Sequence, residues 1–209
     1  MEQGRWLSTP ISTAGLRTTA PQVICDHCQS FWDLSAGNRW AVYGEKTDTQ
    51  LAVREVATGK SFPLFNWAGS RIGRVRLSPD DHWMAFTVRK GGTIKVHVAP
   101  FHPGSAVGVD EVIPITLDDT YASAPIWSPD GSMIYYVSNR DGYVCVWAQR
   151  VDRVTGRPLG VPFAVWHFHE PRQSMSLVPL PTRAIAVSRD RIVVTATEST
   201  GNIWVSRRP

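Results

Sequence analysis

Apolar and polar positions follow one pattern that recurs four times along the chain: two short apolar runs separated by a polar turn. Each turn contains a serine, and the four are Ser35, Ser78, Ser128 and Ser188. The step from each serine to the start of a following apolar run is 16, 16, 16 and 15 residues, ending at Leu51, Ile94, Val144 and Ile203. A fixed period of roughly 40–50 residues, in which each repeat is a small sheet that must stack on its neighbours, predicts a β-propeller.

The repeats divide most of the chain into blades, which are four-stranded antiparallel sheets. The predicted blades cover about 30–65, 73–117, 124–167 and 176–205, and residues 1–29 precede them as a remnant with one outer strand. Predicted strands of the first three blades are 31–34, 39–43, 51–56 and 61–65; 75–77, 83–88, 93–99 and 112–116; and 125–127, 133–138, 143–150 and 163–166. The fourth blade ends after its third strand. We therefore expect an all-β chain with about four blades, forming an incomplete propeller.

The predicted strand at 20–24 has two interpretations. It either closes the ring as the missing strand of the fourth blade, or it ends a preceding blade whose remainder is absent. We favour the second interpretation, because residues 4–19 show no regular pattern. Open sheet edges would then remain, and such edges pair readily with a second copy of the chain.

The composition is typical of a globular domain and excludes only a few classes of function. Hydrophobic residues make up 43% of the 209 positions, and the 22 basic and 18 acidic residues are mixed without runs of one sign. A nucleic-acid-binding surface would gather its basic residues, so we do not predict one. No apolar stretch approaches the 18 residues of a membrane helix, so no membrane span is predicted. The N-terminus carries no recognisable export signal.

The nine tryptophans form an unusually large set for this length. Several occupy equivalent places in the repeat, such as Trp40 with Trp83 and Trp147 with Trp204. Broad rings suit the wedge-shaped contacts between tilted sheets, so we expect them between blades. Stacking on sugars is the alternative for any that are exposed.

Two turns, 78–81 with the sequence Ser-Pro-Asp-Asp and 128–131 with Ser-Pro-Asp-Gly, resemble the P-x-W-S-P-D-G signature of the WD40-like (PD40) repeats in TolB-type bacterial propellers. The third repeat matches best, because Pro-Ile-Trp at 125–127 precedes its turn. The first repeat has Ala36-Gly37 instead, and the fourth has Arg189 for proline with one residue fewer. Proline fixes φ at the first turn position, and aspartate favours the backbone conformation of a tight turn, so we interpret these residues as structural.

The resemblance covers residues 30–209 as a pattern and is specific for fold rather than activity. The stretch from Ile113 to Trp204 is similar to the C-terminal part of larger bacterial propeller proteins, in which a kinase or winged-helix domain often precedes the blades. This implies a recognition or sensing module with a protein or peptide partner. TolB-type relatives are periplasmic, which implies an extracytoplasmic location, but the sequence itself leaves the location open.

Cys25-Asp26-His27-Cys28 is the sharpest local motif. Two thiols at this spacing can share a zinc ion or form a disulfide, although one pair supplies only two ligands. Histidines elsewhere that could complete a site are His82, His102, His167 and His169. We interpret the pair as structural, and Cys145, between two valines of a predicted strand, as a small core residue.

His167 and His169 flank Phe168, which places both imidazoles on one face of an extended segment. This is half of a metal site, but we interpret the segment as a polar loop that leaves the third blade. Asp80, Asp81 and Asp130 are explained by their turns. We therefore predict no catalytic, cofactor-binding or metal-binding residue.

No G-x-S-x-G elbow, P-loop, dinucleotide fingerprint or H-E-x-x-H motif is present in the sequence. The leading hypothesis is a non-catalytic binding module that uses face loops and a central funnel. The alternatives are a metal-dependent propeller enzyme of lactonase or lyase type, and the accessory propeller of a serine peptidase. The sequence does not identify a ligand.

Overall fold

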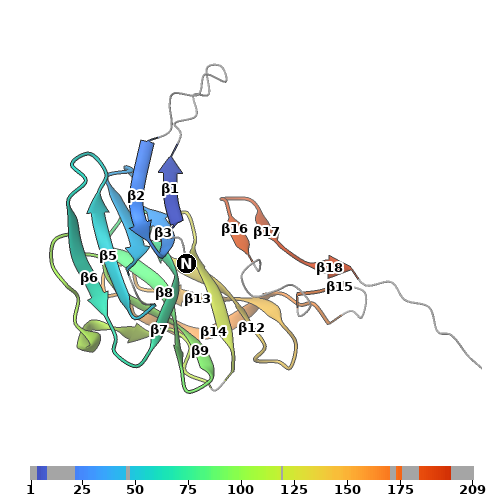
Figure 1. Cartoon of the computed structure of the whole chain (residues 1–209). Coiled ribbons are helices and arrows are strands. Elements are labelled where there is room, and N and C mark those ends of the chain that lie inside the picture. Colours follow the sequence, from blue (N-terminus) through green and yellow to red (C-terminus); the bar gives the residue numbers. More distant parts are fainter. Residues whose placement is uncertain are drawn as a thin grey trace, which may run out of the picture.

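Strands dominate the computed structural model (Figure 1), which describes residues 4–8, 22–45, 48–118, 120–169, 173–175 and 184–198. The side chains of 4–8, 22–23 and 25–27 are outside this description. A single turn of 3₁₀ helix, η1 (Val109–Glu111), interrupts the strands. Across these residues no helix is long and apolar enough to span a membrane.

Three complete blades follow one another along the chain, each with its strands in sequential antiparallel order. The first contains β3 (Ser30–Leu34), β4 (Trp40–Gly44), β5 (Gln50–Glu55) and β6 (Ser61–Asn66). The second contains β7 (Arg71–Leu77), β8 (Trp83–Lys90), β9 (Thr93–Pro100) and β10 (Ile113–Pro114). The third contains β11 (Ala122–Trp127), β12 (Met133–Ser138), β13 (Cys145–Val151) and β14 (Pro158–Trp166). The predicted all-β fold and its four-stranded blades are confirmed.

The fourth blade is described in part. Its strands are β15 (Gln173–Ser174), β16 (Ile185–Val187), β17 (Ile192–Val194) and β18 (Thr197–Glu198), and they form the pairs β16–β17 and β15–β18. The strand predicted near Ile203 lies outside the described residues.

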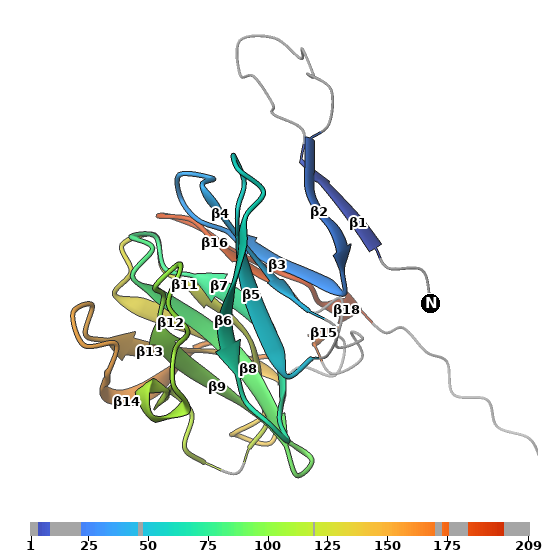
Figure 2. The same ribbon diagram turned by 60° about the vertical axis from the view of Figure 1, so that its left-hand side comes forward.

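The N-terminal region differs from expectation. Instead of one outer strand, it contains two, β1 (Gly4–Ser8) and β2 (Gln22–Cys28), which pair antiparallel. The strand β1 was missed because its two apolar residues, Trp6 and Leu7, are adjacent and do not alternate with polar ones. Cys28 packs on Tyr43 of β4 and Ala52 of β5, so this hairpin lies beside the first blade (Figure 2). Among the described strands, β2 forms no sheet with the fourth blade.

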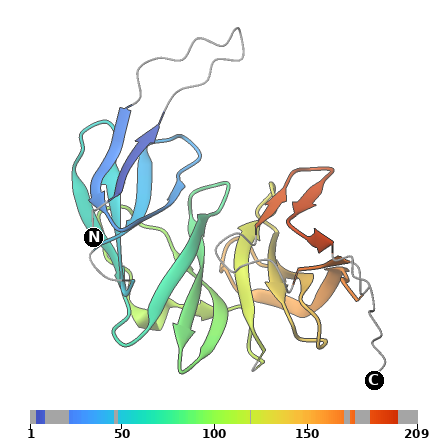
Figure 3. The same ribbon diagram turned by 45° about the vertical axis from the view of Figure 1, so that its right-hand side comes forward.

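The blades are arranged around a common axis in an open arc (Figure 3). The first three blades place their first strands nearest the axis, because β3 contacts β7 and β7 contacts β11; β11 in turn contacts β16 of the fourth blade. Successive blades therefore meet through their inner strands and faces. This arrangement leaves the loops at both ends of each blade free to face solvent.

Apolar clusters fill each interface between neighbouring blades. Leu51 and Phe65 of the first blade pack with Phe86 of the second. Val96 of the second packs with Tyr136 of the third, and Val146 of the third packs near Ile185 of the fourth. The tryptophans follow the same rule, since Trp127 is buried and Trp32, Trp40, Trp67, Trp83 and Trp147 pack on these clusters. Trp166 is the exception among the described tryptophans, with 54% of its surface exposed.

The repeated serine closes all four turns, which explains its recurrence. In the first three turns its Oγ accepts the N–H of the residue that opens the next strand; the pairs are Ser35 with Trp40 (3.0 Å), Ser78 with Trp83 (2.9 Å) and Ser128 with Met133 (2.9 Å). In the fourth turn the Ser188 Oγ accepts the N–H of Arg191, the residue before β17, at 3.1 Å. The first three turns span five residues and the fourth spans three, so it is two residues shorter rather than one. In the longer turns the third residue after the serine adopts a positive φ, as Asn38, Asp81 and Gly131 do.

Candidate functional site

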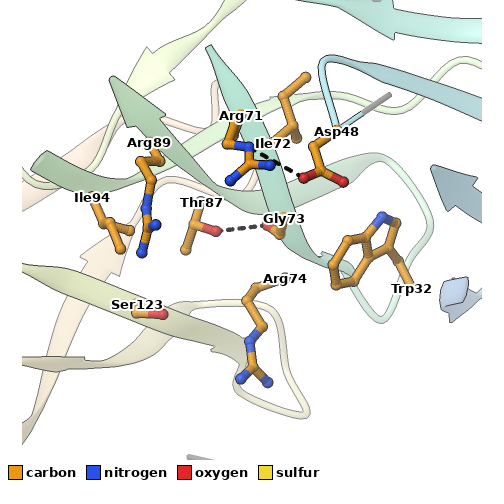
Figure 4. A pocket seen from close by; sticks show the side chains of 10 residues that line it. All are labelled: Trp32, Asp48, Arg71, Ile72, Gly73, Arg74, Thr87, Arg89, Ile94 and Ser123. Carbon is orange, nitrogen blue, oxygen red and sulfur yellow. Dashed lines mark hydrogen bonds and ion pairs between the residues drawn. The ribbon is translucent and has the colours of Figure 1, made fainter. Parts of the chain in front are cut away.

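A cavity of about 480 Å³ lies at one axial end of the first three blades. It is bordered by the beginnings of β7 and β11, the end of β8 and the loop before β5 (Figure 4). Its lining residues are Trp32, Asp48, Arg71, Ile72, Gly73, Arg74, Thr87, Arg89, Ile94 and Ser123. We call it the arginine cavity. Ends of inner strands are where propeller loops and side chains from several blades converge.

Two β-bulges shape this cavity. The register of β7 with β8 shifts between Gly73 and Arg76, and that of β11 with β12 shifts between Ser123 and Ile126. Inside these bulges Arg74 and Ala124 both have a φ of 53°, in the left-handed region. A bulge bends its strand and redirects a side chain, which accounts for an arginine of an inner strand lining the cavity.

The lining is strongly cationic. Arg71, Arg74 and Arg89 are opposed by one carboxylate, Asp48, so the lining carries a net charge of +2. Asp48 forms an ion pair with Arg71, with 3.3 Å between Oδ2 and Nε. In Figure 4 Arg71 and Arg89 lie above and beside Thr87, and Arg74 lies below it. Burial lowers the pKa of Arg74, but a guanidinium remains charged at neutral pH.

Beside the arginines the cavity has an aromatic wall. The Trp32 ring lies against Gly73, where an added Cβ would meet its Cη2 at 3.5 Å. Thr87 Oγ1 donates to the Gly73 carbonyl at 2.8 Å, which fixes this part of the wall. The Trp32 Nε1 is buried and has no hydrogen-bond partner in the described structure. Guanidinium groups next to an aromatic surface suit an anionic ligand with apolar parts.

A second cluster contains four residues that the sequence analysis had assigned to separate features. His167 Nδ1 and His169 Nε2 lie 3.2 Å apart, and both contact Asp141 Oδ2, at 3.0 and 2.9 Å. With the Cys145 Sγ, these ligand atoms all lie within 4.8 Å of one another. We call these four residues the 141–169 cluster. The expectation that both imidazoles share one face is confirmed, and Phe168 between them is buried.

The protonation properties of the cluster reflect its position at the edge of the core. Burial raises the pKa of Cys145, an effect that the Phe168 N–H partly offsets by donating to Sγ at 3.3 Å and that the charge of Asp141 reinforces. Burial also acts to raise the pKa of Asp141, but hydrogen bonds from His169 and the Tyr143 N–H outweigh it and lower that pKa. Cys145 is buried, as predicted, while both histidines are exposed.

The other candidates from the sequence are structural where they are described. Cys28 is buried and disulfide-bonded, whereas the side chains of Cys25, Asp26 and His27 lie outside the description. Asp80 and Asp130 accept the hydroxyl groups of their turn serines, both at 2.6 Å.

Asp81 and two more histidines lie elsewhere. Asp81 accepts the N–H of Ala36 at 3.0 Å and so links two blades. His82 and His102 line a separate cavity of about 740 Å³ together with Trp83. Neither histidine belongs to the 141–169 cluster.

The sequence missed the arginine cavity because its residues come from three blades. Arg74 and Arg89 fall just outside the predicted strands 75–77 and 83–88, and only the bulge in β7 and the stacking of the blades bring them to one place. Asp141 and Cys145 were assigned to a hairpin loop and to the core, both correctly, without any signal that the two histidines would reach them.

Solved structures with this architecture are β-propellers. TolB from Acinetobacter baumannii is similar with a TM-score of 0.56 and 16% identity, over 86% of this chain and 43% of that one. The tricorn protease gives 0.55 and 12%, over 87% and 20%. A putative TolB from Agrobacterium tumefaciens gives 0.50 and 17%, over 71% and 50%. No protein-family model and no curated protein matches the chain.

These similarities define the class of the protein: it has a β-propeller fold. At such identities the likeness concerns the fold alone. The chain spans half or less of the length of each of these solved structures. The expected TolB-type architecture is thus supported, whereas membership of the WD40-like repeat family rests on the turn motifs described above.

Proposed function

We propose that the chain is a non-catalytic binding module that holds an acidic segment of a protein or peptide partner in the arginine cavity. The observation that carries this proposal is that three arginines and a single carboxylate line one cavity. Carboxylates bind guanidinium groups through charge-assisted, often bidentate, hydrogen bonds. The cavity lies at an axial end of the blades, where a rigid scaffold can present a binding surface.

Each lining group has a role in this proposal. Arg74 and Arg89 bind carboxylates of the partner, and Trp32 contacts the apolar part of its chain. Asp48 restrains Arg71 through their ion pair and lowers the net positive charge of the site. An acidic segment would compete with Asp48 for Arg71, so Asp48 tunes affinity.

A peptide of eight glutamates, fluorescently labelled, provides the test by anisotropy. Arg74→Gln and Arg89→Gln should each weaken binding about tenfold, because a hydrogen bond to a charged group contributes roughly 1.5–3 kcal/mol. Asp48→Asn should strengthen binding several-fold. Added salt should weaken binding throughout.

The matched control is Arg157→Gln, which removes the same charge from an exposed turn outside the cavity. It should leave the affinity unchanged. If Arg157→Gln weakened binding as much as Arg74→Gln, or if an eight-lysine peptide bound equally well, the attraction would be general and the proposed site would be wrong.

A further inference from the structure

In the 141–169 cluster three polar atoms lie so close together that their contacts cannot all be favourable hydrogen bonds. His167 Nδ1, His169 Nε2 and Asp141 Oδ2 form a triangle with edges of 2.9, 3.0 and 3.2 Å. If both ring nitrogens donate to the carboxylate, their two hydrogens face each other across the third edge. If one nitrogen is an acceptor instead, its lone pair faces the carboxylate oxygen. One edge of the triangle is therefore unfavourable in either arrangement.

A cation between these three atoms removes the conflict, because all three can then direct a lone pair at it. Around a zinc ion with nitrogen or oxygen ligands at about 2.0–2.1 Å, neighbouring ligand atoms of a tetrahedron lie roughly 3.3 Å apart. The three observed edges are close to that spacing. The Cys145 Sγ lies on the buried side of the triangle, within 4.8 Å of every other ligand atom.

We propose that the 141–169 cluster is a four-coordinate binding site for a transition metal ion of the zinc type. Two imidazoles, a thiolate and a carboxylate are ligands that zinc prefers, and hard cations such as magnesium select against the thiolate. The sulfur completes the set with a shift of about 1 Å, since a tetrahedral edge to sulfur is roughly 3.6 Å. Four protein ligands leave no open position, so the site is structural rather than catalytic.

Surrounding groups support each ligand. Asp141 Oδ1 accepts the Tyr143 N–H at 3.3 Å, which leaves Oδ2 for the metal, and the Tyr143 ring lies 4.3 Å from the His169 ring. The Phe168 N–H points at the Cys145 sulfur, as suits a metal-bound thiolate. The histidines are half-exposed, so an ion can enter from solvent.

The position of the site gives it a structural consequence. Asp141 belongs to the loop between β12 and β13, whereas His167 and His169 belong to the segment that leaves the third blade. Between them, Phe168 packs in the cluster that contains Met175 and Ile185 of the fourth blade. A bound ion would therefore fix the crossover to the fourth blade and stabilise the interface between these two blades.

Titration of the metal-free chain with Co²⁺, with the disulfide of Cys28 kept intact so that Cys145 is the free thiol, tests the proposal. We expect one ion per chain, the intense visible bands of four-coordinate cobalt, and a near-ultraviolet charge-transfer band from sulfur, all lost when Zn²⁺ displaces cobalt. Zinc at a hundredfold excess over its dissociation constant should raise the Tm by roughly 5–10 °C.

Variants assign the ligands. His169→Ala should abolish the four-coordinate bands, and Asp141→Asn should weaken binding at least tenfold. Cys145→Ser should retain cobalt with lower affinity and lose the charge-transfer band. His102→Ala, an exposed histidine of the second blade, is the matched control and should behave as the parent chain. Near-ultraviolet circular dichroism of each metal-free variant identifies any that fail to fold.

The proposal is wrong if the parent chain shows only the weak spectrum of six-coordinate cobalt. It is also wrong if His169→Ala and Asp141→Asn, both folded, bind the ion as tightly as the parent chain. Persistence of the charge-transfer band in Cys145→Ser would exclude Cys145 as a ligand and contradict the proposed set. None of these outcomes depends on the arginine cavity, so this proposal and the proposed binding function can fail separately.

Discussion

Single hydroxyl groups determine the shape of the repeat at the residue scale. The Ser128 Oγ accepts the Met133 N–H and donates to Asp130, and its side chain is buried. Ser188 occupies the same place in the fourth blade but is exposed. The serine hydroxyl therefore contributes more to the free energy of unfolding in the third blade than in the fourth. A buried N–H that loses its acceptor cannot form a replacement hydrogen bond with water.

Ser128→Ala should lower the free energy of unfolding by about 1–3 kcal/mol, because the Met133 N–H loses its acceptor. Ser188→Ala should cost less than about 0.5 kcal/mol, because water replaces the hydroxyl. Urea unfolding of both variants measures the two losses. Equal losses would mean that burial of the turn serine does not matter.

His97 gives the chain a predictable acid response. Its ring lies between Phe86, at 6.0 Å, and Trp67, at 5.6 Å, and burial lowers its pKa from 6.5 to about 4. Between these values the unfolded chain binds a proton that the folded chain excludes. The stabilisation is thus complete above pH 6.5 and is lost as the pH falls towards 4.

His97→Phe keeps the ring packing and removes this titration. Across that pH window the parent chain should lose about 2–3 kcal/mol more stability than the variant. Denaturant unfolding at several pH values measures the difference. His102→Phe, at an exposed position, should keep the parent profile, and parallel profiles for the parent and His97→Phe would refute the role of His97.

Contacts between elements hold the blades together beyond their apolar clusters. The Trp83 ring of the second blade rests on the turn before β14 of the third, and its Nε1 donates to the Arg153 carbonyl at 2.9 Å. A Cβ on Gly156 would lie 2.6 Å from Cζ3 of this ring. Glycine is therefore required there for close approach as well as for its φ of +66°.

Gly156→Ala should lower stability by about 2–4 kcal/mol, from backbone strain plus displacement of the tryptophan. Gly160, with a φ of +67° and open space around it, is the matched control. Gly160→Ala should cost only the strain, about 1–2 kcal/mol. Thermal unfolding compares the two, and equal costs would show that the contact with Trp83 contributes nothing.

The positions of individual strands were the feature of the structure that the sequence predicted most accurately. The strands of the first blade were predicted within a residue at nearly every end, because alternation and turn chemistry are local. The early start of β7 was missed because Arg71 to Arg74 carries two arginines that do not look like an inner strand. Those same arginines line the arginine cavity. The hydrophobic pattern therefore failed to predict the strand at the site where we propose that the partner binds.

At the scale of the whole molecule, juxtaposition across blades could not be predicted. Nothing in one dimension indicates that Asp48, Arg74 and Ser123 share a cavity, because that depends on how far each blade rotates about the axis. The four-blade organisation itself was predictable, since each repeat needs neighbours to cover its faces.

The open arc of blades also predicts association of the chain with itself. β14 is the outer strand of the third blade and exposes Leu159 (50%), Val161 (82%) and Trp166 (54%). Sedimentation velocity should show a dimer fraction that grows with concentration, and Val161→Lys should reduce it, because a charged side chain on an edge strand opposes pairing. Thr155→Lys, in the exposed turn before this strand, is the control. A chain that stays monomeric at all concentrations would contradict the prediction.

We expect an acidic partner to bind at the axial end of the inner strands. Hydrogen–deuterium exchange with and without the eight-glutamate peptide tests it directly, since exchange reports where amides become protected. With the peptide held near its dissociation constant for the parent chain, we expect slower exchange at 71–74, 87–94 and 121–123 in the parent chain and much weaker protection in Arg74→Gln. Protection located instead on the outer strands β6 and β14, or retained in full by Arg74→Gln, would contradict it.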